Sequence, residues 1–248
     1  MKKGFTLAEV LITLTILGVV AAMTIPVITS YTRELEYKSK AKKTFSMLTQ
    51  SFAMASLQGY APVHEAADGS ALNIIQWFDK YLSPNLSTIK KCTDLPKSDI
   101  DKNNLSNANW DKVGQCWHKG HTKGLNGKNL YCSYETSIGG GVVQAILNDG
   151  TFINIDSYGA GSIGTYFGHD ITTSSGIVLF FDVNGVQKPN VLGKDIFVAV
   201  YENGGLVPAY VSRTSEQAEA ECSSKHPGPG GAGNGYACLK VIMDKALQ

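Results

Sequence analysis

One carboxylate lies within an otherwise apolar stretch near the start of the chain. The 21 residues from Phe5 to Ile25 contain Glu9 as their only charged side chain. A carboxylate in an apolar span costs about 2.5–3.5 kcal/mol even on lenient insertion scales, so it calls for a cationic partner. The stretch contains no basic residue. Cleavage after Gly4 would give Phe5 a free α-amino group four residues before Glu9, and the two groups could neutralise each other within one chain or between chains.

The residues around this carboxylate resemble those of a known family. The segment from Gly4 to Pro26, about a tenth of the chain, reads GFTLAEVLITLTILGVVAAMTIP. It is similar to the N-terminal segment of type IV pilins and type II secretion pseudopilins. The resemblance implies that a membrane peptidase cuts between Gly4 and Phe5 and N-methylates Phe5. It also implies that Glu9 aligns each subunit against the N-terminus of its neighbour in a filament.

Other interpretations of the same stretch stay open. At about 1.5 Å per residue the apolar helix is roughly 32 Å long, enough to cross a bilayer, so it could be a plain anchor. Val20-Ala21-Ala22 before Met23 satisfies the small-residue rule of a secretory signal. The helix N-terminus and the α-amine could also satisfy Glu9 locally.

Lys2 and Lys3 place the extreme N-terminus on the cytoplasmic side, and hence the rest of the chain outside the cytoplasm.

Five cysteines follow the membrane segment, and an oxidising compartment favours their pairing into disulfides. Two bridges and one leftover thiol are expected. Cys222 and Cys238 flank a Gly/Pro loop and form the first expected pair. Cys92 with Cys116 is the second, with Cys116–Cys132 as its alternative. Cys116, His118 and His121 are also metal-capable, but their spacing fits no common zinc pattern.

A second candidate metal site follows an apolar strand. Asp182, Asn184 and Asp195 offer oxygen ligands around a glycine turn in FFDVNG…PN…GKDIF. This region resembles the C-terminal loop in which major pseudopilins carry calcium. The bidentate acid of an EF-hand loop is missing, and Asp-x-Asn-Gly is also an ordinary turn in which Asp caps the local backbone. Calcium is therefore one of two expectations for this loop, and no cofactor is the other.

The sequence indicates a structural protein rather than an enzyme. No G-x-S-x-G motif occurs, the five histidines are scattered, and the glycines at 139–141 lack phosphate-loop spacing. A formal net charge of +1 gives no sign of nucleic-acid binding over the whole surface. The local cluster of Lys38, Lys40, Lys42 and Lys43 is interpreted as a solvated helix face, with a DNA-binding site as the weaker alternative.

The elements that must position these residues are one long helix and a sheet. We expect residues 1–4 to be a leader peptide, residues 5–58 one helix with a kink at Pro26, and residues 59–248 a globular head. Beyond Pro26, six apolar positions follow helical spacing and should lie against the head: Leu35, Ala41, Phe45, Leu48, Phe52 and Ala55.

The head contains four to five predicted strands. They cover residues 142–147, 151–156, 177–183, 196–201 and 206–210, and Asn148-Asp149-Gly150 is a strong hairpin turn between the first two. Shorter helices are expected over 72–82 and 215–222, a surface loop over 93–128 and a flexible loop over 226–235. The predicted fold class is α+β, a long helix packed on an antiparallel sheet, similar to pilins.

Together these features predict a subunit of a type IV pilus or type II secretion-like filament. Its head of about 190 residues is larger than major pseudopilins usually carry, which favours a minor pilin or pseudopilin. The partners implied by the resemblance are the prepilin peptidase, other subunits and an inner-membrane assembly platform. The expected location is the inner membrane, with the head outside the cytoplasm, and then a periplasmic or extracellular filament. The alternative is a membrane-anchored binding protein that never polymerises.

Overall fold

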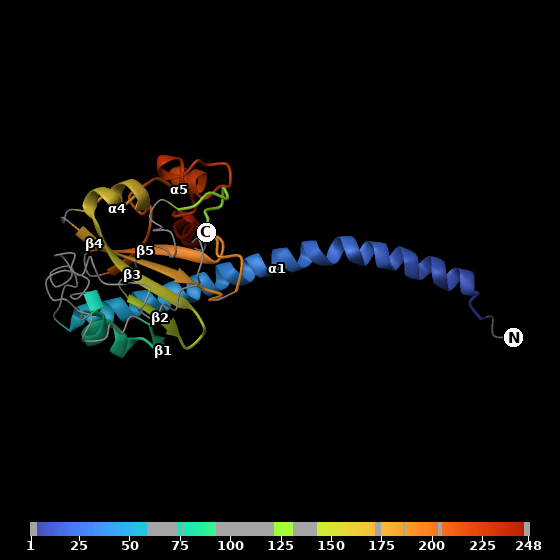
Figure 1. Cartoon of the computed structure of the whole chain (residues 1–248), viewed down its shortest axis with the longest axis horizontal. Coiled ribbons are helices and arrows are strands. Elements are labelled where there is room, and N and C mark those ends of the chain that lie inside the picture. The colour runs from blue at the N-terminus through green and yellow to red at the C-terminus, as the bar shows by residue number, and fades with distance from the viewer. Residues whose placement is uncertain are drawn as a thin grey trace.

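One long helix and a six-stranded antiparallel sheet dominate the architecture (Figure 1). The computed structural model describes residues 4–58, 74–75, 77–92, 122–130, 143–171, 175–185, 187–202 and 205–245. Its helices are α1 (Leu7–Leu57), α4 (Ala160–Phe167), α5 (Ser215–Glu221), α6 (Cys238–Asp244) and the short turns η1 (Phe78–Leu82), η2 (Ser83–Asn85) and η4 (Pro229–Gly231). Its strands are β1 (Thr88–Lys91), β2 (Val143–Leu147), β3 (Phe152–Gly159), β4 (Ser175–Asp182), β5 (Ile196–Glu202) and β6 (Gly205–Pro208).

Helix α1 consists of an exposed half and a packed half. No described residue before Tyr37 is buried, whereas eight residues from Tyr37 onward are. The buried positions follow helical spacing: Tyr37, Ala41, Thr44, Phe45, Leu48, Ser51, Phe52 and Ala55. The predicted stripe is confirmed except at Leu35, which is 48% exposed. The helix continues through Pro26, and the exposed half follows a gentle arc as it leaves the head (Figure 1).

The sheet is a meander in which each strand pairs with the next along the chain. The β2–β3 hairpin turns at Asn148-Asp149-Gly150, as predicted: Gly150 has φ +85° and its N–H donates to the Leu147 carbonyl. Thr151 N donates to Asp149 Oδ1 at 3.0 Å, which closes the turn. The α+β fold class predicted from the sequence is therefore confirmed, and β1 is an additional edge strand.

Both faces of the sheet are covered, which explains the nearly continuous apolar sequence of β4. Alternate residues of the strands, such as Leu179 and Phe181, join the core that contains Phe52 of α1. The intervening residues, such as Phe180, join a second core around Phe167 of α4. Phe52 lies 5.7 Å from Trp77 and 5.6 Å from Tyr201 between ring centroids, so aromatic contacts join the long helix to the sheet.

Two parts of the head differ from the sequence predictions. Helix α4 was not predicted, because its sequence AGSIGTYF is rich in glycine; burial of Ile163 and Phe167 stabilises it. Residues 226–235, whose composition predicted a flexible loop, form a loop that hydrogen bonds tie to Asn126. Asn126 Nδ2 donates to the carbonyls of His226 (3.0 Å), Pro227 (3.2 Å) and Ala232 (2.9 Å). The predicted helix over 72–82 is helical in its described part, and the predicted helix over 215–222 is α5, which Thr214 caps. Near the end of the chain, residues Cys238–Asp244 form helix α6.

Candidate functional site: the N-terminal helix and the base of the head

The predicted cleavage site is freely accessible. Phe5 is 88% exposed, and Gly4 is exposed beside it. A Cβ added at Gly4 would meet no atom within 4 Å, so the fold does not require glycine at this position. A glycine that packing does not need is consistent with recognition of this residue by another protein. Cleavage after Gly4 and methylation of Phe5 stay predictions.

Glu9 belongs to the cap of helix α1. Its Oε2 accepts hydrogen bonds from Thr6 N and Thr6 Oγ1, both at 2.8 Å, and Thr6 Oγ1 accepts one from Glu9 N at 3.3 Å. This reciprocal arrangement is a capping box, which satisfies two of the free donors at the helix start. Both bonds to the carboxylate use the same oxygen. Within the described residues Glu9 Oε1 makes no hydrogen bond, so the carboxylate can cap the helix and still accept a cation.

The apolar half of α1 has the properties of a membrane span. Its most apolar 18-residue window has a mean hydropathy of 2.4, and none of that window is buried. The threonines that interrupt it bond within the helix: Thr13 Oγ1 donates to Glu9 O, Thr15 to Leu11 O and Thr24 to Val20 O, at 2.8–2.9 Å. These hydroxyls need no water, as hydrocarbon surroundings require. The helix is thus suited to membrane anchoring.

The expected disulfide between Cys222 and Cys238 is present, with their Cα atoms 4.9 Å apart. Cys92 is also disulfide-bonded and buried. Cys116 and Cys132 lie outside the described residues, as do His118 and His121, so the partner of Cys92 stays open between the two cysteines.

A buried carboxylate that the sequence analysis missed holds the Cys222–Cys238 loop closed. Glu221 is 1% exposed and accepts hydrogen bonds from the N–H groups of Gly235 (2.7 Å), Tyr236 (3.1 Å) and Ala237 (2.7 Å). Burial raises the pKa of Glu221, and the three amide hydrogen bonds oppose that rise. The sequence gives only a weak signal for this role of Glu221, a glutamate just before a cysteine. The N–H groups that donate to its carboxylate lie 14 to 16 residues further along the chain.

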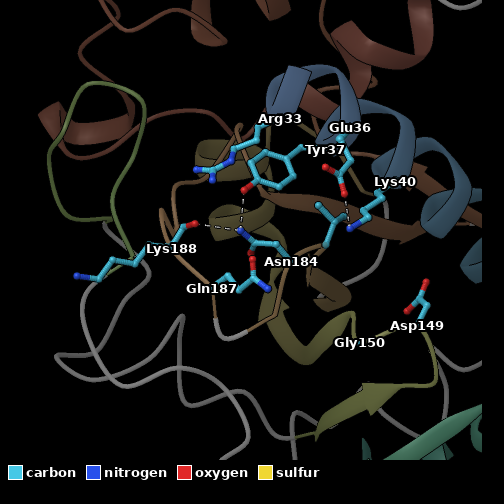
Figure 2. Close-up of a pocket in the computed structure, with 10 residues that line it drawn as sticks. Arg33, Glu36, Tyr37, Lys40, Asp149, Gly150, Asn184, Gln187 and Lys188 are labelled. Atoms are coloured by element: carbon cyan, nitrogen blue, oxygen red, sulfur yellow. Dashed lines mark hydrogen bonds and ion pairs between the residues drawn. The ribbon is translucent and has the colours of Figure 1, made fainter. Parts of the chain in front are cut away.

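The three candidate calcium ligands come together beside α1. Figure 2 shows one of them, Asn184, next to Tyr37 of this helix. Asn184 Nδ2 lies 3.1 Å from Asp195 Oδ2, 3.2 Å from Tyr37 Oη and 3.3 Å from the Lys188 carbonyl oxygen. Asn184 N donates to Asp182 Oδ1 at 3.0 Å. This cluster ties the loop after β4 to Tyr37 of α1.

The carboxylates of this cluster already accept hydrogen bonds from backbone N–H groups, so they are poorly suited to bind a cation. Asp195 Oδ1 accepts from Val191 N at 2.7 Å and Oδ2 from Asn190 N at 2.8 Å, while Asp182 Oδ1 accepts from both Asn184 N and Gly185 N. A calcium ion would compete with these backbone amides for the same oxygens. Burial raises the pKa of Asp195, and hydrogen bonds from Val191 and Asn190 oppose this. Across the described ranges, no three His, Cys, Asp or Glu residues form a metal-binding group. Calcium binding at this loop stays untested, and these backbone contacts argue against it.

Comparison with known proteins bears on the N-terminal segment. The family model described as the prokaryotic N-terminal methylation motif matches residues 1–25. No curated protein and no solved structure matches the chain. The match covers the accessible Gly4–Phe5 junction, the capped Glu9 and most of the exposed apolar helix. The chain thus carries, over its first 25 residues, the prepilin-type methylation motif of type IV pilins and pseudopilins.

Proposed function

We propose that this chain is a structural subunit of a type IV pilus or a related type II secretion filament. The observation that carries the proposal is the methylation motif on a helix whose apolar half has no buried residue. An exposed apolar surface of this length needs either lipid or the helices of neighbouring subunits around it. In the proposed function, lipid surrounds this apolar surface before assembly, and the helices of neighbouring subunits surround it afterwards.

The proposed sequence of events starts with cleavage between Gly4 and Phe5 by a prepilin peptidase, which also methylates Phe5. The chain then stays in the inner membrane through one span, with its head outside the cytoplasm. An assembly platform transfers it into a filament of like subunits, where Glu9 pairs with the N-terminal amine of a neighbour. The size of the head favours a minor pilin or pseudopilin, and the role is structural rather than enzymatic.

Mass spectrometry of the mature N-terminus tests the first step. We expect the native protein to begin with N-methylated Phe5. Gly4→Val should leave the leader attached, whereas the matched control Gly18→Ala should be processed normally. A Cβ has open space at both glycines, so neither substitution should disturb the helix by a clash. A native chain that begins anywhere other than Phe5 would refute the proposal.

A second candidate function is a membrane-anchored binding protein that does not polymerise. One observation favours it: the Glu9 carboxylate is already hydrogen-bonded within its own chain, by Thr6. If capping is the only function of Glu9, a charge pair between subunits is unnecessary.

Two substitutions separate capping from charge pairing. Glu9→Gln keeps an oxygen for the Thr6 N–H but removes the charge, because glutamine also completes a capping box. Thr6→Val removes the hydroxyl that accepts from Glu9 N and keeps the charge. The filament proposal predicts that Glu9→Gln strongly reduces the filaments sheared from cells, while Thr6→Val assembles. Normal filaments from Glu9→Gln would refute the pairing of Glu9 with a neighbour.

A further inference from the structure

Two hollows flank α1 where it enters the head. One, of about 310 Å³, lies between α1, the β2–β3 turn and the loop after β4, and Figure 2 shows Arg33 and Lys188 at its edge. The other, of about 540 Å³, lies between α1, α6 and Lys194, with the Cys222–Cys238 disulfide in its wall. Both hollows therefore open at the base of the head, near the exposed half of the helix.

Seven of the ten charged side chains around these hollows are cationic. Three of their lysines form ion pairs: Lys38 with Glu34 (2.6 Å), Lys40 with Glu36 (2.8 Å) and Lys245 with Glu219 (3.2 Å). Four further cations have no ion-pair partner in the described part of the chain: Arg33, Lys42, Lys188 and Lys194. We call these four the basic collar.

Among the residues that the structure describes, one further carboxylate, that of Asp149, lines either hollow. The collar therefore has a surplus of positive charge, although the whole chain has a formal net charge of only +1. The surplus is concentrated on one end of the head.

The length of the helix places this charge near a membrane surface. Apolar residues continue to Ile28, and Tyr31 follows as an aromatic residue of the kind found at membrane interfaces. Arg33 is five residues beyond Ile28, roughly 7–8 Å along the helix, and Tyr37 is roughly 13–14 Å beyond it. The backbone of Lys188 is near the level of Tyr37, because Asn184 Nδ2 contacts both the Tyr37 hydroxyl and the Lys188 carbonyl oxygen.

Electrostatic attraction acts over such distances. The polar headgroup layer extends about 5–7 Å beyond the hydrocarbon on each side. Arg33 therefore lies at the headgroups, and Lys188, near the level of Tyr37, lies within about one Debye length, ~8 Å at physiological salt, of the lipid phosphates. Lys42 is roughly 21 Å beyond Ile28, so its attraction to the phosphates is more strongly screened.

We propose that the basic collar binds the anionic phospholipid headgroups of the membrane in which the chain is anchored. Attraction at the exposed side chains of Arg33, Lys188 and Lys194 holds the base of the head against the bilayer before assembly, and the half-buried Lys42 contributes less. This inference rests on the membrane anchoring of the proposed function but not on polymerisation, so it does not depend on the outcome of the Glu9 experiment.

Photo-crosslinking of the full chain in vesicles tests the proposal. The photoreactive residue p-benzoylphenylalanine replaces Gln187, which is exposed next to Lys188 of the collar, or Ile89, which is 68% exposed on β1. The vesicles contain phosphatidylcholine alone or a mixture with phosphatidylglycerol. We expect about five-fold more lipid adduct at position 187 in the anionic vesicles, a difference that disappears at high salt, and little adduct at position 89 in either.

A matched pair of double variants isolates the collar. Lys188→Gln with Lys194→Gln should abolish the preference for anionic vesicles at position 187. Lys80→Gln with Lys90→Gln removes the same charge from exposed positions outside the collar and should leave the preference unchanged. Equal adducts in the two kinds of vesicle, or a preference that survives the collar variant, would overturn the proposal. A chain that alkaline extraction releases from the vesicles would instead refute the membrane anchoring itself.

Discussion

Replacement of Glu221 by glutamine tests whether one buried carboxylate keeps the C-terminal loop closed. Glu221 Oε1 accepts from the N–H groups of Gly235 and Tyr236, and Oε2 accepts from that of Ala237 at 2.7 Å. In Glu221→Gln one oxygen keeps its two donors. The amide nitrogen that replaces Oε2 is itself a donor and faces the Ala237 N–H, so one buried backbone donor loses its acceptor.

The expected loss of stability follows from these three bonds. A buried donor without an acceptor costs about 1–3 kcal/mol, and each bond to Oε1 weakens by roughly 1 kcal/mol when the charge is lost. Relief from burying a charge acts in the opposite direction, since burial raises the pKa of Glu221. We expect a net loss of about 2–3 kcal/mol. For a domain of this size that lowers the unfolding midpoint by roughly 4–12 °C.

Thermal unfolding of the full chain in detergent micelles, followed by near-ultraviolet circular dichroism, measures this loss. The control is Glu219→Gln, two residues earlier on α5, whose exposed carboxylate lies 3.2 Å from Lys245 Nζ. An exposed ion pair contributes at most about 1 kcal/mol. If the midpoint of Glu221→Gln falls within about 1 °C of the control, the loop does not depend on this carboxylate and our reasoning is wrong.

Three further outcomes are expected. Phe52→Ala should lower the free energy of unfolding by about 3–5 kcal/mol in urea, because the ring is fully buried, whereas Met54→Ala, 56% exposed on the same helix, should change it little. Burial raises the pKa of Asp195, so its contribution to stability is full below the unfolded-chain pKa and is lost as pH rises through the folded one. The midpoint difference between the wild type and Asp195→Asn should therefore widen as pH falls from 7 to 4, and a narrowing difference would contradict this sign. A calcium chelator should leave the wild-type melting midpoint unchanged, because backbone amides already occupy the Asp195 oxygens; a lower midpoint would indicate a bound ion.

Much of the fold was predictable because its signals are local. The spacing of Ala41, Phe45 and Leu48 identifies one face of a helix within two turns. Asn148-Asp149-Gly150 identifies a hairpin within three residues, since its glycine can adopt the positive φ that the turn needs. The apolar run of β4 predicts a buried strand but cannot by itself say that both faces are covered.

Other features depend on contacts between distant residues. Helix α4 forms despite weak intrinsic propensity because Ile163 and Phe167 pack into the second core. The glycine-rich loop after α5 is held by Asn126, about 100 residues earlier in the chain. No local pattern encodes such a contact, and composition alone suggested flexibility instead.

The features of the candidate site also fall into two groups, those set by adjacent residues and those set by contacts between distant residues. The sequence by itself determined the methylation motif, the length of the apolar span and the presence of one acid within it, because each depends on residues adjacent along the chain. Only the tertiary structure decided that Glu9 caps its own helix, that backbone amides surround Asp195, and that the loop carrying Lys188 and Lys194 lies beside Arg33 and Lys42. Folding brings the loop at Asn184 back to Tyr37 of α1, 147 residues earlier in the chain, and the positive charge of that surface exists only once the two segments lie together.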